Sequence, residues 1–130
     1  MRINDFSEME AEFIERVHTM VWCNAATVDS KQRPRSRILH PIWESKVGWI
    51  GTNRNSHKSR HLDNNPYMSL AYIANIAQPL CVDCTAEWVD DITERQRIWD
   101  LFKGAPEPLG YDPAPIFGSI ENFGLLKLTP

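Results

Sequence analysis

Short extended segments separated by turn residues limit most strongly the folds that this chain can form. In residues 22–52, short apolar-rich runs are interrupted by Asp29-Ser30-Lys31-Gln32 and by Glu44-Ser45-Lys46. Runs of this length bounded by turn residues are typical of antiparallel strands. We therefore expect two consecutive hairpins, formed by the segments 22–28, 34–43 and 47–52.

The same pattern returns later in the chain, between helical stretches. Strands are expected at 67–73, 80–88 and 124–129, which makes six in all. Helices are expected from a Ser7–Glu10 capping box to Met20, over 56–63, and from Asp91 onward. Four prolines in 106–115 predict an irregular loop. Pro41 has no N–H for a ladder, so the segment 34–43 should end or bulge near it.

Length and composition place these elements in one domain. A chain of 130 residues falls within the usual size of a single domain, and no internal repeat or linker divides it. We therefore expect one domain over residues 1–130, mainly β with short helices, that forms a small β-barrel. The final strand ends at Thr129, so the expected barrel has an open edge. Either the chain is trimmed at its C-terminus or a partner chain covers that edge.

Charge and cysteine content narrow the functional classes. The formal net charge is −3, which argues against a general nucleic-acid binder. No apolar run approaches the ~18 residues of a membrane helix, and acidic residues stand where a signal peptide needs an apolar core. Three cysteines are too few for a disulfide framework. We expect a cytoplasmic protein without a membrane or nucleic-acid partner.

Two pairs of residues have the spacing of metal ligands, but their surroundings favour other interpretations. Cys81 and Cys84 are three residues apart within an expected strand, which places them on opposite faces. His57 and His61 are four residues apart on an expected helix, but Lys58 and Arg60 lie beside them and disfavour a cation. We therefore expect no metal site, chemically quiet thiols, and histidines that face a phosphate or the solvent.

The positive charge of the chain is concentrated in one stretch. Residues 31–61 hold eight Lys or Arg and one acid, Glu44, so they carry +7 while the remainder carries −10. Long cationic side chains repel one another, and their concentration favours an anion between them. A solvated basic face is the alternative.

Residues 49–58 indicate where such an anion would bind. An expected strand ends at Thr52, a polar loop follows, and a helix begins near Ser56 with Lys58 in its first turn. Free N–H groups and the helix dipole attract a phosphate there. Arg37, from the preceding strand, would add a second charge-assisted contact. A helix that simply begins with a serine cap is the alternative.

Three sequence blocks carry a family resemblance. They are Pro34-Arg35-Ser36-Arg37-Ile38-Leu39, then Gly51-Thr52-Asn53 with Ser56-His57-Lys58, then Asn64-Asn65-Pro66-Tyr67-Met68-Ser69-Leu70. In order and spacing they resemble the FMN-binding split-barrel family related to pyridoxamine 5′-phosphate oxidase. The resemblance implies a six-stranded antiparallel Greek-key split β-barrel and a homodimer with FMN at its interface.

The resemblance also implies the cofactor contacts. Arg37 and Lys58 would hold the flavin phosphate together with neighbouring polar residues, and apolar and small residues would present backbone and side chain to the ring and the ribityl chain. The complete expected set is Arg37, Ile38, Leu39, Gly51, Thr52, Ser56, His57 and Lys58. No catalytic residue is implied.

Departures from the family pattern shape the expected function. Ile42 stands where the true oxidase has a lysine, and the oxidase's C-terminal Arg-containing segment is absent. The resemblance therefore implies a flavin-dependent oxidoreductase with another small-molecule redox substrate. A reductase that uses the deazaflavin coenzyme, a non-catalytic flavin or haem carrier, and a colourless scaffold that binds another anionic metabolite are the alternatives.

Overall fold

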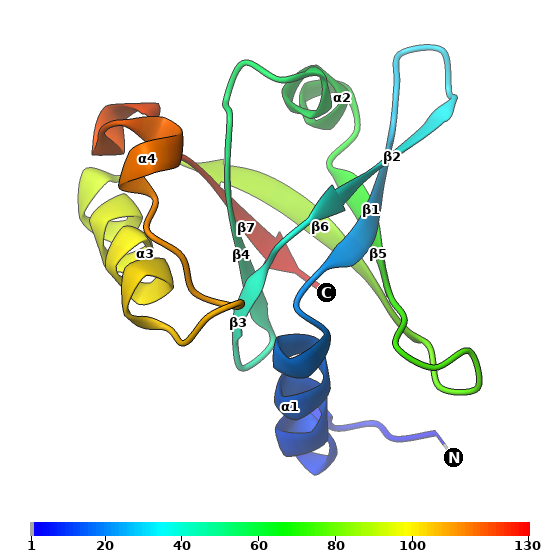
Figure 1. Ribbon diagram of the computed structural model, residues 1–130. Coiled ribbons are helices and arrows are strands. Elements are labelled where there is room, and N and C mark those ends of the chain that lie inside the picture. The colour runs from blue at the N-terminus through cyan, green and yellow to red at the C-terminus, as the bar shows by residue number, and fades with distance from the viewer. Residues whose placement is uncertain (1) are drawn as a thin grey trace.

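Seven strands form one curled antiparallel sheet in the computed structural model, which describes residues 2–130 (Figure 1). The strands are β1 (Cys23–Val28), β2 (Pro34–Leu39), β3 (Ile42–Glu44), β4 (Val47–Thr52), β5 (Tyr67–Tyr72), β6 (Leu80–Val89) and β7 (Gly124–Thr129). Their order is β2-β1-β5-β6-β7-β4-β3, and all neighbours are antiparallel. The expected mainly β class with short helices is confirmed.

The expected count of six strands is wrong, because the segment 34–43 forms two strands. β2 ends at Leu39 and β3 begins at Ile42, with His40 and Pro41 between them. A proline cannot donate to a ladder, so the interruption falls where Pro41 predicts it. β2 pairs with β1 at one edge of the sheet, and β3 pairs with β4 at the other. Two residues thus connect opposite edges, and the sheet curls into a half-barrel.

The two expected hairpins form, but they are not neighbours in the sheet. β1 pairs with β2 and β3 pairs with β4, while the second partner of β4 is β7. Because β7 lies about half the chain away in sequence, the local pattern contains no signal for this pairing. The Greek-key connection stays a prediction.

Four α-helices and two short 3-10 turns are described in residues 2–130. They are η1 (Phe6–Glu8), α1 (Glu10–Met20), α2 (His57–Asn64), α3 (Ile92–Gly104), α4 (Ala114–Phe117) and η2 (Ile120–Asn122). The Ser7–Glu10 capping box does not form, because the Asp5 carboxylate accepts the Ser7 N–H at 2.9 Å and starts η1 instead. Asp91 caps α3 through the Thr93 N–H at 2.8 Å. The expected loop 106–115 runs into α4.

The helices close the half-barrel around two apolar clusters. In the first, Phe13 and Val17 of α1 pack with Trp43, whose Nε1 donates to the Tyr72 hydroxyl at 3.0 Å. In the second, side chains of α3 pack with residues of β3, β4 and β7. Its buried members are Ile42, Trp49, Ile98, Phe102, Phe123 and Leu125.

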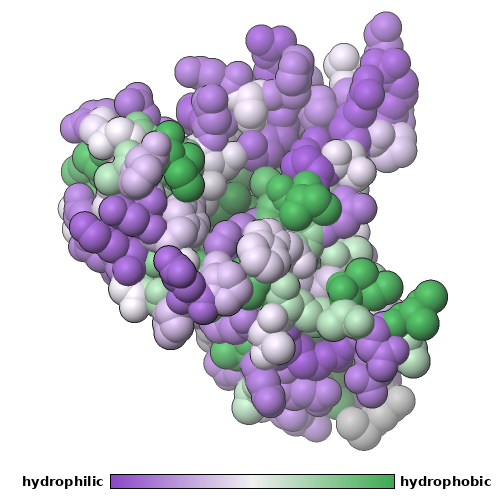
Figure 2. Space-filling view, viewed as in Figure 1, coloured by the Kyte–Doolittle hydropathy of each residue, from purple (hydrophilic) through white to green (hydrophobic). Residues whose placement is uncertain are grey.

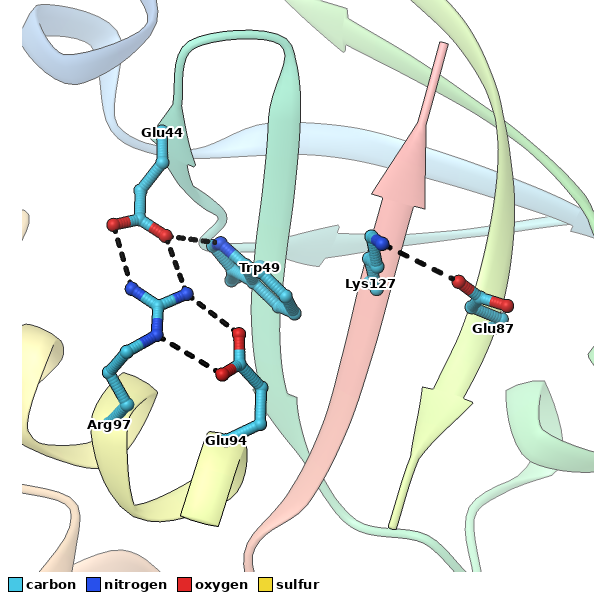
Figure 3. A network of polar contacts seen from close by, with 6 residues as sticks. All are labelled: Glu44, Trp49, Glu87, Glu94, Arg97 and Lys127. Atoms are coloured by element: carbon cyan, nitrogen blue, oxygen red, sulfur yellow. Dashed lines mark hydrogen bonds and ion pairs between the residues drawn. The ribbon is translucent and has the colours of Figure 1, made fainter. Parts of the chain in front are cut away.

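α3 is also held by a charged network at its exposed side (Figure 3). Arg97 donates from both Nη atoms to the Glu44 carboxylate of β3, each at 2.9 Å, and it pairs with Glu94 on its own helix at 2.7 Å. Trp49 Nε1 adds a bond of 2.9 Å to the same Glu44 carboxylate. The network joins α3 to the β3–β4 hairpin.

β6 places Cys81 and Cys84 on opposite faces, as expected. Cys81 is exposed and Cys84 is buried, with its Sγ donating to the Met68 carbonyl at 3.3 Å. Burial raises the pKa of the Cys84 thiol to about 12. Within residues 2–130, His, Cys, Asp and Glu side chains do not gather in a group of three that could bind a metal ion.

None of the helices in residues 2–130 combines the length and the apolar character that crossing a membrane requires.

Candidate functional site

A basic cleft lies between the β1–β2 hairpin and α2. Its volume is about 490 Å³, within the ~300–1,000 Å³ range of ligand pockets. Hydrophilic residues dominate the surface over both elements in the upper part of Figure 2. The lining residues are Asp29, Ser30, Arg33, Arg35, Arg37, His57, Arg60, His61 and Asn64.

Asp29 organises the hairpin side of this cleft. One carboxylate oxygen accepts the backbone N–H groups of Lys31 and Arg33 at 2.9 and 3.0 Å, which holds the expected turn. The other oxygen accepts Nε of Arg33 at 2.9 Å and Nε of Arg35 at 3.3 Å. Asp29 is only 9% exposed, and these bonds, the Arg33 N–H first, hold the pKa of its carboxyl below the ordinary range.

Arg37 enters the cleft from β2. It pairs with Ala25 of β1, and since opposite residues of an antiparallel pair share a face, its side chain points to the buried side of the sheet. Its Nη1 donates to the Ala25 carbonyl at 3.2 Å, and burial lowers the pKa of the guanidinium. Ile38 lies on the other face and is 65% exposed.

One face of α2 forms the opposite wall. His57, Arg60, His61 and Asn64 recur at helical spacing and all line the cleft. His61 shares a hydrogen bond of 2.9 Å between its Nδ1 and the Thr27 hydroxyl of β1, which fixes the helix to the sheet. Burial first, and then the charge of Arg37, lowers the pKa of His61.

Lys58 lies on the buried face of α2 and is only 8% exposed. Its Nζ donates to the Ser56 hydroxyl at 3.0 Å. Burial lowers the pKa of the Lys58 ammonium, and the charge of Arg37 lowers it further. Within residues 2–130, no carboxylate forms an ion pair with Lys58 or with Arg37.

The first turn of α2 leaves further donors available. Ser56 stands at the N-cap, but its side chain makes no capping bond. In the described part of the chain, the N–H groups of His57 and Lys58 have no acceptor, as is usual for the first turn of a helix. Two cationic side chains and two free N–H groups thus come from β2 and α2, which is the donor set that a phosphate requires.

The structure separates the eight residues expected at the cofactor. Of these, only Arg37 and His57 line the cleft, and Lys58 lies behind it on α2. Gly51 and Thr52 lie at the end of β4, where a Cβ on Gly51 would come within 2.3 Å of the Phe123 ring. This contact gives Gly51 a packing role that the sequence did not indicate. The contacts of the whole set with a cofactor stay a prediction.

Several cleft residues were absent from the sequence-based set. They are Asp29, Ser30, Arg33, Arg35, Arg60, His61 and Asn64. Most belong to the basic stretch 31–61, so charge concentration was the available signal. Trp43 and Trp49 do not line the cleft, because they are buried in the two apolar clusters.

Comparison with known proteins identifies the family of this chain. A family model described as pyridoxamine 5′-phosphate oxidase matches residues 7–107. No curated protein matches the chain in a sequence search.

Solved structures show the same fold at low sequence identity. The haem storage protein HutZ from Vibrio cholerae is 19% identical, with a TM-score of 0.67 over 94% of this chain and 89% of that one. An F420 reductase is 17% identical, with a TM-score of 0.65 over 89% and 90%. An FMN-binding protein related to pyridoxamine 5′-phosphate oxidase, from Nostoc punctiforme, is 18% identical, with a TM-score of 0.61 over 98% and 81%.

Proposed function

Because the chain belongs to the pyridoxamine 5′-phosphate oxidase family, we propose that it is a flavin-binding oxidoreductase that holds FMN beside the basic cleft. The buried Lys58 next to the half-buried Arg37 is the observation that carries the proposal. A buried charge is unfavourable unless a counter-charge accompanies it. A phosphate dianion would supply that counter-charge to both side chains.

The residues of this chain would bind and orient the cofactor. Arg37, Lys58 and the first-turn N–H groups of α2 would hold the phosphate, while the Ser56 hydroxyl accepts a hydrogen bond from the Lys58 ammonium. Gly51 and Thr52 at the end of β4 would contact the ring and the ribityl chain, together with the backbone of Ile38 and Leu39 at the end of β2. A bound flavin supplies hydride or electron transfer, while the protein supplies orientation and exclusion of water.

A second copy of the chain completes the proposed site. The outer sheet face consists of the outward-pointing residues of β1, β2, β5 and β6: Asn24, Ala26, Ser36, Ile38, Tyr67, Ser69, Ala71, Cys81, Asp83 and Thr85. No helix in the described residues covers it, and Ile38 and Tyr67 are 65% and 66% exposed. We propose that this face forms a homodimer interface, with FMN at its border, in a cytoplasmic protein.

Oxidation of pyridoxamine phosphate is not proposed. Ile42 is only 3% exposed within the second apolar cluster, so the position of the oxidase's lysine faces the core here. The redox substrate is therefore another small molecule.

Two alternative cofactors have structural neighbours in their favour. A deazaflavin reductase is favoured by the F420 reductase with the same fold, and a non-catalytic haem carrier by the haem storage protein HutZ. The absorption spectrum and mass of the chromophore that co-purifies with the protein distinguish these from FMN. Turnover of a reduced nicotinamide or deazaflavin distinguishes an enzyme from a carrier.

Titration of the apoprotein with FMN and with riboflavin tests the phosphate site. Replacing Arg37 by Ala or Lys58 by Met removes a charge-assisted bond worth about 1.5–3 kcal/mol, a loss of roughly 10- to 150-fold in FMN affinity. Riboflavin has no phosphate, so its affinity should stay within about twofold of wild type. Lys58→Met should also raise the thermal unfolding midpoint of the apoprotein, because it removes an uncompensated buried charge.

Lys31→Ala is the matched control for these variants, because Lys31 is exposed on the same hairpin and lies outside the cleft lining. Its FMN affinity should equal that of wild type. Equal FMN affinity in all four proteins would contradict the proposal.

A further inference from the structure

The cleft holds more positive charge than one phosphate requires. Its lining includes four arginines and a single carboxylate, Asp29. The proposed phosphate site uses Arg37 together with Lys58 behind the lining. Arg33, Arg35 and Arg60 remain, and Asp29 offsets only one of them. Like charges that share one cleft repel one another, and a second anionic group would balance the excess.

Asp29 binds two of these arginines through their Nε atoms. From the two guanidiniums, its carboxylate accepts only at Nε, at 2.9 Å for Arg33 and 3.3 Å for Arg35. In the described part of the chain, the terminal Nη groups of both guanidiniums make no hydrogen bond. One buried carboxylate therefore orients two forks of N–H donors, the geometry that recognises a phosphate or carboxylate in a bidentate way.

The remaining groups extend the same surface. Arg60 lies on the cleft face of α2, opposite the hairpin, and Ser30 and Asn64 add neutral donors to the lining. The volume of about 490 Å³ is far more than a single phosphate group fills.

We propose that Arg33, Arg35 and Arg60, oriented by Asp29, form a second anion subsite, and that the cleft takes a ligand whose phosphate is joined to another anionic group. The inference rests on the proposed phosphate site, which it extends along the cleft. The second group is a phosphate or a carboxylate, since the guanidinium forks recognise both. FMN has one phosphate and would not occupy this subsite, which could then bind the acidic part of a substrate. A longer cofactor could instead fill it with its own acidic part.

Calorimetric titration with small anions tests the subsite. Pyrophosphate and 2-phosphoglycolate carry a second anionic group, whereas inorganic phosphate and glycerol 3-phosphate do not. At a fixed ionic strength, we expect the wild-type protein to bind at least one of the first two about 10-fold or more tightly than either of the second two, the gain of one charge-assisted contact. The better of the two identifies the second group. No preference for either would overturn the proposal.

Variants separate the subsite from the general charge of the cleft. The double variant Arg33→Gln/Arg35→Gln should abolish the preference and leave phosphate affinity within about twofold. Lys31→Gln/Lys46→Gln removes the same charge from exposed positions outside the lining and should keep the preference. If both double variants reduce it equally, only net charge matters and the subsite does not exist.

Asp29→Asn tests positioning without removing a cation. It raises the net charge of the cleft, so a purely electrostatic effect would strengthen pyrophosphate binding and keep the preference over phosphate. Loss of orientation should reduce the preference instead. The Arg37 variant reports separately on the proposed function: if it binds phosphate as wild type does while Arg33→Gln/Arg35→Gln loses the preference, the FMN phosphate site is misplaced and the second subsite stands.

Discussion

Gly51 shows how a residue expected at a cofactor can be required by packing. A Cβ at this position would lie 2.3 Å from Cε2 of Phe123 and 3.0 Å from the Tyr111 hydroxyl. Phe123 is fully buried, and it also contacts Trp99 and Phe117 edge-on. Because Phe123 is buried among these rings, a glycine at this position allows β4 and the segment before β7 to approach each other.

Gly51→Ala should therefore destabilise the protein by about 1–3 kcal/mol, the usual cost of overpacking a filled core. Chemical denaturation followed by tryptophan fluorescence measures the change. Gly104→Ala is the control, because a Cβ there meets nothing within 4 Å. Equal unfolding midpoints for the two variants would show that Phe123 yields without cost and that Gly51 serves another purpose.

At the level of elements, two histidines lie at the connection between β2 and β3, and their surroundings favour the neutral form of both rings. His18 of α1 accepts the Trp43 N–H at its Nε2, with a distance of 3.0 Å. His40 packs against the rings of Trp22, Phe102 and Tyr111, and its Nε2 is buried without a partner in the described part of the chain. Burial lowers the pKa of His18. Burial also lowers the pKa of His40, and a hydrogen bond with the backbone offsets only part of this effect.

These shifts predict a loss of stability in mild acid. Above pH 6.5, the ordinary histidine pKa, both the folded and the unfolded chain hold neutral rings, and the full stability is present. Below it, the unfolded chain binds protons that the folded chain does not, so the free energy of unfolding falls by at most about 1.4 kcal/mol per pH unit for each histidine. The fall ends once the pH reaches the lowered pKa of the folded state.

His18→Gln isolates one of the two contributions. A glutamine carbonyl can accept the Trp43 N–H without titrating, so this variant should lose less stability than wild type between pH 7.5 and 5.5. Urea denaturation at several pH values measures the slope. An unchanged slope would assign the acid sensitivity to other groups.

At the scale of the whole molecule, the half-barrel leaves one sheet face open. Ile38 and Tyr67 on the outer sheet face, and Ile73 directly after β5, are 65%, 66% and 63% exposed. A stable obligate dimer commonly buries upwards of ~2,000 Å² of total surface. We propose that flavin binding and dimerisation depend on the same face.

Sedimentation velocity at micromolar concentration tests the dimer. Wild type should sediment with the mass of two chains, whereas Ile38→Glu and Tyr67→Glu should shift it toward one chain by placing a charge in the interface. Ile116→Glu changes an isoleucine that is equally exposed, at 66%, but lies on α4 away from this face, and it should leave the dimer intact. Flavin-bound wild type with the mass of one chain would contradict the proposal.

Features that depend on neighbours a few residues apart could be predicted from the sequence. The expected strand 124–129 matches the bounds of β7, and the alternation of side chains along a strand predicted the opposite faces of Cys81 and Cys84. Turn residues predicted both hairpins, and the charge of residues 31–61 predicted a basic site. Each of these follows from periodicity or composition, which the backbone geometry of a strand or a helix converts directly into position.

The contacts between distant elements could not be predicted from the sequence. Pro41 could be identified as an interruption, but not as the corner that sends β2 and β3 to opposite edges of the sheet. Nothing near Asp29 in the sequence shows that one carboxylate orients two arginines toward α2, or that Lys58 is buried beside Arg37. Burial and long-range pairing depend on how the whole sheet curls and packs, and local sequence patterns do not encode this.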